Sequence, residues 1–120
     1  MELNDIIARY MPTNDFVRSL SELFAGFAHD TRIRIISLLA IAPLNVGDIS
    51  RVLGCNQTTI SHQLRILKDR KIVFYQRQGK EIVYALNQER VNPLMLDAVE
   101  FLSPGKDKPG FPGGNSPFSR

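Results

Sequence analysis

The sequence has a single cysteine, no tryptophan and no long apolar run among its 120 residues. One cysteine excludes an internal disulfide framework, and it also excludes a zinc site built from several cysteines of one chain. No apolar stretch approaches the length that crosses a membrane. Glu2, Asp5 and Arg9 interrupt the N-terminal segment, where a signal peptide needs a continuous apolar core. We therefore expect a soluble, cytoplasmic protein.

The residues that would carry catalysis are also missing. The sequence shows no nucleophile–base set, and its one glycine pair, Gly113-Gly114, does not follow a predicted strand and so forms no phosphate-binding loop. Asp97 and Glu100 are three residues apart, but a solvated helix face explains this spacing better than a paired-carboxylate site. We expect neither an enzyme nor a bound cofactor.

Positive charge is concentrated in the middle of the chain. Residues 51–80 carry seven Lys or Arg against Asp69 alone, whereas residues 1–50 and 81–102 are each net negative and the whole chain is only +3. A basic patch between acidic flanks predicts an anionic partner that approaches this one face.

Apolar spacing predicts helices in the N-terminal half. Residues 3–10 form a short helical turn, and Thr13 or Asn14 caps a helix whose apolar residues lie on one face. Asp30 is expected to cap a central core helix over residues 31–41, which is apolar on most sides.

Two further helices are predicted around a tight turn. Asn45 and Asp48 have capping spacing, Gly54 can take the left-handed conformation that ends a helix, and Asn56 caps a helix over residues 57–69. The buried positions expected on these two helices are Val46, Ile49, Val52, Leu53, Ile60, Leu64 and Leu67.

The C-terminal half predicts a hairpin and one more helix. Residues 72–77 and 81–86 are rich in β-formers, with Gly79 in the turn between them. A last helix is expected over residues 92–102, with Asn92 as cap and Pro93 at its first position. Residues 103–120 are rich in proline and glycine, so we expect a disordered tail.

This order of elements predicts a mainly α fold with a small β-hairpin: a winged helix-turn-helix of about five helices and a two-stranded wing. Residues 1–102 would form one domain for DNA binding and dimerisation, because a small helical domain often completes its core in a dimer. The partners expected are double-stranded DNA and a second copy of the chain.

The second helix of the turn has the side chains that DNA reading requires. Glutamine can pair with adenine, arginine with guanine, and a threonine methyl with that of thymine. We expect base contacts from Gln57, Thr58, Ser61, His62 and Arg65, and backbone contacts from Lys68, Arg77 and Lys80. An ordinary solvated face, or an interaction module whose basic face docks an acidic protein, are the alternatives.

Three segments together resemble one known family. Residues 27–36 (FAHDTRIRII) are similar to the second-helix signature of the ArsR/SmtB (arsenic-repressor) family of winged-helix regulators. Residues 57–67 (QTTISHQLRIL) resemble its recognition helix, and residues 77–80 with 83–86 resemble its wing. The likeness covers about residues 14–102. It implies a homodimer formed by the first and last helices, a palindromic operator, and repression relieved by a signal.

The chain departs from the family's metal sensors. The Cys-x-Cys that such sensors carry on the third helix is replaced by Asn45 and Gly47, which do not bind a soft metal. A second type of site uses Asp and His on the last helix, and residues 92–102 contain no histidine. We therefore expect no metal site.

Two histidines and the cysteine have alternative interpretations. His62 fits a DNA contact better than a metal ligand, and His29 fits a partly buried, hydrogen-bonded role. Cys55 fits a small buried apolar residue better than a thiol switch, since Arg51 is the only nearby residue in the sequence whose charge could stabilise a thiolate. The inducing signal stays open among oxidation of Cys55, a small apolar ligand between the dimer helices, and no ligand.

Overall fold

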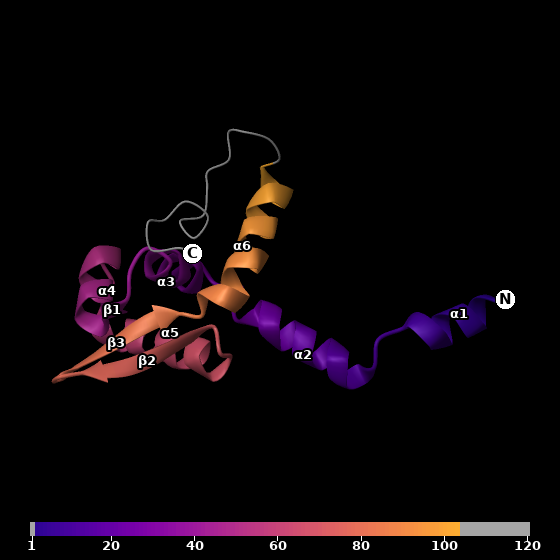
Figure 1. The fold of residues 1–120 in the computed structure, drawn as a ribbon, viewed down its shortest axis with the longest axis horizontal. Coiled ribbons are helices and arrows are strands. Elements are labelled where there is room, and N and C mark those ends of the chain that lie inside the picture. The colour runs from indigo at the N-terminus through magenta and orange to yellow at the C-terminus, as the bar shows by residue number, and fades with distance from the viewer. Residues whose placement is uncertain (1, 104–120) are drawn as a thin grey trace.

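The computed structural model describes residues 2–103, and within them it contains six helices and one three-stranded antiparallel sheet (Figure 1). The predicted tail lies outside this range, except for Ser103. The elements are α1 (Leu3–Tyr10), α2 (Asn14–Ala25), α3 (Asp30–Leu39), β1 (Leu44–Asn45), α4 (Val46–Leu53), α5 (Gln57–Asp69), β2 (Val73–Gln78), β3 (Glu81–Leu86) and α6 (Gln88–Leu102). The predicted winged helix-turn-helix is confirmed.

The core forms around α3, as its nearly continuous apolar surface predicts. Ile35, Ile36 and Leu39 of this helix are buried, and α5 packs its own apolar side against the same cluster. The remaining buried apolar residues come from the elements around α3 and α5: Ala40, Ile49, Ile72, Val73, Leu86 and Val91.

Local capping explains where most of the N-terminal helices begin. Asn45 Oδ1 accepts a hydrogen bond of 2.7 Å from the Asp48 amide, and Thr13 Oγ1 accepts one of 3.2 Å from the Phe16 amide. The predicted cap of α3 was wrong: the exposed His29 caps this helix, because its Nδ1 accepts a 3.2 Å bond from the Thr31 amide. His29 is thus hydrogen-bonded, as expected, but it is not partly buried.

The sheet contains a strand that the sequence did not predict. β1 pairs with β3 through Leu44–Tyr84 and Asn45–Val83, so the sheet order is β1-β3-β2. Two residues are too few to show the alternation by which a strand is recognised. β1 is important for the site because it connects the wing hairpin to the first turn of α4.

The helix α6 begins five residues earlier than predicted, at Gln88 instead of Pro93. Pro93 is inside the helix, and Asn92 does not cap it; the Asn92 Oδ1 is buried without a hydrogen-bond partner. The helix begins after Asn87, whose Nδ2 donates to the Lys71 carbonyl oxygen at 3.0 Å. A proline indicates a helix start only statistically, and here a long-range contact decides where the helix begins.

The buried side of α4 differs from the prediction at one position. Ile49 is fully buried and Val46 and Leu53 are half-buried, but Val52 is 53% exposed. At about 100° per residue, Val46 and Leu53 lie on the same side of Ile49, whereas Val52 lies on the other. The buried arc therefore turns toward Ser50, which is 7% exposed.

The N-terminal helices project from the rest of the molecule (Figure 1). No residue of α1 or α2 is buried, and Phe16, Leu20 and Phe24 of α2 are 57%, 41% and 58% exposed. A stripe of large apolar side chains in water is unfavourable. The single chain therefore leaves the apolar side of α2 without a partner among residues 2–103.

The end of α2 approaches the body of the molecule at Gly26. A Cβ at this position would lie 2.7 Å from Ile72 Cδ1, 2.8 Å from Arg70 Cδ and 3.2 Å from the Leu23 carbonyl oxygen. These distances are shorter than van der Waals contact, so only a residue without a side chain allows this approach.

We expect Gly26→Ala to lower the free energy of unfolding by about 1 kcal/mol, because the added methyl must displace Ile72 and Arg70. Gly47→Ala is the matched control: its Cβ would lie 3.5 Å from the nearest atom, and alanine favours a helix, so stability should rise by up to about 1 kcal/mol. Urea unfolding measures both. Equal effects of the two substitutions would contradict the close approach at Gly26.

Candidate DNA-binding surface

The helix α5 is fixed to the core by one side only. Ile60, Leu64 and Leu67 are each 0% exposed, and they lie on one side of the helix. Gly54, with φ 69°, turns the chain sharply between α4 and α5. Because the inner side of α5 is held in the core, its other side must face solvent.

The cap of α5 leaves its first turn well ordered and accessible. Asn56 Oδ1 accepts a hydrogen bond of 2.8 Å from the Thr59 amide. The five side chains that the sequence predicts as base contacts all lie on the solvent side and are exposed: Gln57, Thr58, Ser61, His62 and Arg65. This arrangement gives the donors, acceptors and one guanidinium that reading of base edges in a major groove requires.

The wing is a hairpin with a basic tip. β2 pairs with β3 from Val73–Leu86 to Gln78–Glu81, and Gly79 in the turn has φ 66°. Arg77 and Lys80 are exposed at this end of the hairpin. The structure therefore places both predicted wing cations at the exposed tip of the hairpin.

Two contacts that the sequence did not reveal hold the wing in place. Asn45 Nδ2 donates to Glu81 Oε1 at 2.6 Å, which joins the cap of α4 to the hairpin. Lys68 Nζ lies 5.3 Å from the centre of the Tyr75 ring, and this cation–π contact joins the end of α5 to β2 of the wing. The two partners of each contact are separated in the sequence, so no local sequence pattern predicts these contacts.

The same aromatic group extends to Tyr84. The Tyr75 and Tyr84 rings are 5.8 Å apart. Burial raises the pKa of Tyr84 above its usual value of 10.0, and the Coulombic effect of Tyr75 raises it further. The Tyr84 hydroxyl is therefore neutral at physiological pH and adds no negative charge near the basic surface.

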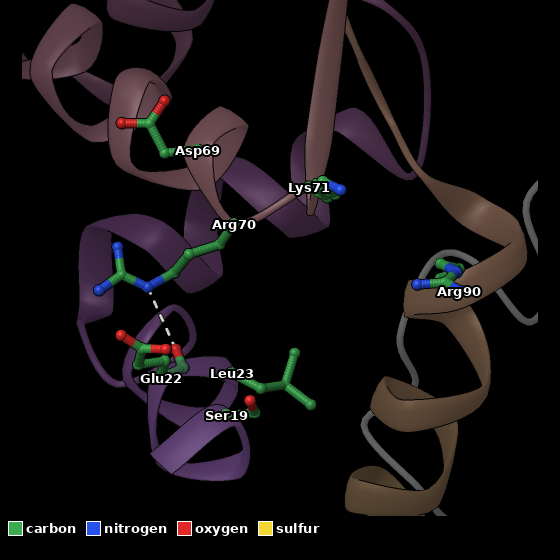
Figure 2. Close-up of a pocket in the computed structure, with 7 residues that line it drawn as sticks. All are labelled: Ser19, Glu22, Leu23, Asp69, Arg70, Lys71 and Arg90. Carbon is green, nitrogen blue, oxygen red and sulfur yellow. Dashed lines mark hydrogen bonds between the residues drawn. The ribbon is translucent and has the colours of Figure 1, made fainter. Parts of the chain in front are cut away.

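Arg70, which follows α5, is directed away from the predicted DNA-reading side. Its Nε donates to the Glu22 carbonyl oxygen of α2 at 3.1 Å (Figure 2). It lines a pocket of about 750 Å³ together with Lys71 and Arg90, and this pocket lies between α2, the end of α5 and the start of α6. Arg70 is one of the seven cations of residues 51–80, and its hydrogen bond to Glu22 joins the end of α5 to α2.

The candidate metal and redox positions have structural roles. Asn45 caps α4, and residues 2–103 contain no group of three or more His, Cys, Asp or Glu placed to hold a metal ion. Cys55 is half-buried against the core, and its thiol donates to the Leu53 carbonyl oxygen at 3.7 Å. Its packing fits a small apolar residue.

In the same described range, no helix is both long and apolar enough to span a membrane.

The fold and its exposed α5 define a winged-helix DNA-binding protein. Comparison with known proteins identifies the family. Residues 29–75 match the family model described as "Bacterial regulatory protein, arsR family". The Synechocystis "Transcriptional repressor SmtB homolog" is 32% identical over 88 residues, which cover 73% of this chain and 67% of that protein. The Mycobacterium tuberculosis regulator NmtR is 36% identical over 74 residues, which cover 62% of each chain.

Solved structures agree with this assignment. The crystal structure of M. tuberculosis Rv0081 has a TM-score of 0.71 at 26% identity, covering 76% of this chain and 92% of that one. The homodimeric winged helix-turn-helix domain of Mb0332 from Mycobacterium bovis has a TM-score of 0.66 at 25% identity, covering 78% and 93%. The chain belongs to the arsR family of bacterial regulatory proteins, which are DNA-binding transcriptional regulators. The predicted family and class of function are confirmed.

We expect Asn56→Ala to lower the free energy of unfolding by about 1 kcal/mol, because the Thr59 amide loses its capping acceptor. Thr59→Ala is the control, since it keeps the cap and alanine favours the helix. Thermal unfolding measures both variants. If Asn56→Ala is as stable as the wild type, the cap does not order the first turn of α5.

Proposed function

We propose that this chain is a homodimeric transcriptional repressor that binds an inverted-repeat operator through α5 and the β2–β3 wing. The observation that carries the proposal is the division of α5 into a fully buried inner side and an outer side on which every predicted base contact is exposed. The names of two relatives support repression, namely the SmtB homolog and the Bacillus subtilis "Transcriptional repressor SdpR".

In this proposal the outer side of α5 enters the major groove. Gln57 and Thr58, in the first turn, reach base edges near the helix N-terminus, and Arg65 reaches a guanine two turns further on. Arg77 and Lys80 contact the adjacent phosphate backbone from the wing tip. Lys68 rests on Tyr75, so it adds positive potential close to the same surface. The acidic flanks of the sequence leave this face as the main attraction for DNA.

A second copy of the chain would cover the apolar side of α2. A groove of about 460 Å³ lies between α2, α3 and α6, and most of its lining is apolar, including Phe24, Phe27, Met95, Val99 and Leu102. The unpartnered stripe of α2 continues into this groove. The printed title of the Mb0332 structure describes a homodimer, and a two-fold dimer would present two recognition helices to successive major grooves.

The dimer proposal predicts the effect of a charge on the apolar stripe. We expect Leu20→Glu to produce a monomer, because the carboxylate would be desolvated in the interface. Arg18→Glu is the control, since Arg18 is exposed on the opposite side of α2, where it forms an ion pair with Asp15. Sedimentation equilibrium reports the mass of each. A dimeric Leu20→Glu variant would exclude α2 from the interface.

Two substitutions in the protein test DNA binding itself. Their affinities are measured on DNA fragments that the wild-type protein selects from random sequences. Arg65→Ala should weaken specific binding by about 1 to 3 kcal/mol and relax the sequence preference at one position. Lys80→Ala should weaken binding uniformly across sequences and lower the salt dependence by about one counterion.

Arg34→Ala is the matched control for both substitutions, because Arg34 is exposed on the side of α3 opposite the buried residues of that helix. Fluorescence anisotropy at several salt concentrations gives the affinities. Unchanged affinity in Arg65→Ala and Lys80→Ala would exclude this surface. Weak, sequence-independent binding by the wild type would favour docking of an acidic protein instead.

A further inference from the structure

One arginine connects three helices through a single guanidinium group. Arg32 of α3 donates from Nε to Gln63 Oε1 of α5 at 2.7 Å, and from Nη1 to the Ala25 carbonyl oxygen at the end of α2, also at 2.7 Å. Both bonds are short for nitrogen donors. Gln63 is 9% exposed, so this contact lies on the inner side of the recognition helix.

A second arginine makes a similar connection further along α5. Arg70, at the end of that helix, donates to the Glu22 carbonyl oxygen (Figure 2). Gln63 and Arg70 are separated by about two helical turns, or roughly 10 Å along the helix axis. Two attachment points at this separation fix the direction of α5 as well as its distance from α2.

Core packing alone does not account for Arg32. Gln63 Oε1 and the Ala25 carbonyl oxygen are both uncharged, so a half-buried cation gives up hydration for hydrogen bonds to neutral acceptors. Apolar residues of similar volume often serve a core equally well. What arginine adds is geometry, because its planar group donates in two fixed directions at once, which the ammonium group of lysine does not.

We propose that Arg32 is a positioning residue that sets the orientation of the recognition helix relative to α2, and thereby the specificity of DNA binding. The inference rests on the proposed function. In a two-fold dimer joined through α2, the link from Arg32 to Gln63 fixes how both recognition helices meet successive major grooves. A change in this link misplaces both helices together, whereas sequence-independent attraction depends on exposed cations and is unaffected.

Four variants test this role by their ratio of specific to nonspecific affinity. Arg32→Lys and Gln63→Met should each lower the specific affinity about tenfold, as expected for a lost charge-assisted hydrogen bond, with nonspecific affinity unchanged. Gln63→Glu keeps an acceptor for Arg32 and should retain the ratio. Arg34→Lys, two residues along α3 and exposed, is the matched control.

The double variant Arg32→Met/Gln63→Met separates positioning from stability. Replacing both partners of a buried hydrogen bond by apolar groups can restore stability. We expect its thermal midpoint to recover above that of Gln63→Met while the specificity ratio stays low. A ratio that returns together with the midpoint would overturn the proposal, as would wild-type specificity in Arg32→Lys.

Amide hydrogen exchange of the DNA-free protein provides an arm that needs no operator. Arg32→Lys should increase exchange within residues 60–66 of α5, and Arg34→Lys should not. If the wild type binds no DNA specifically, the proposed function fails, but increased exchange would still support the link between α2 and α5. Unchanged exchange in Arg32→Lys would overturn the positioning role even where specific binding is observed.

Discussion

The burial of one side of α5 under α3 is the interaction on which the rest of the structure depends. Ile60, Leu64 and Leu67 are completely removed from solvent, which together stabilises the domain by several kcal/mol, at about 1.5–3 kcal/mol for each side chain. This burial also decides which residues face outward. A recognition helix needs a fixed inner side more than it needs any particular outer residue, because base reading requires that the outer side chains keep their positions.

Several smaller contacts orient the elements around this helix. β1 and the Asn45–Glu81 hydrogen bond join the wing to α4, and the cation–π contact between Lys68 and Tyr75 joins the wing to α5. The Schellman-like end of α5, where the Ile72 amide donates to the Leu67 carbonyl oxygen at 2.9 Å, directs the chain into β2. Each contact is modest, yet together they orient the wing and α5, which in our proposal present their exposed side chains to the same DNA.

The sequence predicted those features that depend on local spacing. Apolar periodicity identified the buried side of α5, and the caps at Thr13, Asn45 and Asn56 follow from bonds within one turn. It missed the features that depend on contacts far apart in the chain. The strand β1 is too short to show a sequence pattern. The start of α6 is set by the hydrogen bond between Asn87 and the Lys71 carbonyl oxygen, and Arg32 donates to Gln63, which is 31 residues away in the sequence. The exposed apolar stripe of α2 combines both situations. Its apolar spacing is visible in the sequence, but the surface that would cover it is, in our proposal, a second copy of the chain.

Hydroxyl-radical footprinting on a selected operator tests the central claim most directly, because it shows where the protein lies on the DNA. If a dimer inserts α5 from each subunit, two protected tracts should appear, related by a two-fold axis and centred one helical turn apart, about 10 base pairs, or a multiple of it. Protection that is uniform along the fragment, or a single tract without symmetry, would contradict the account.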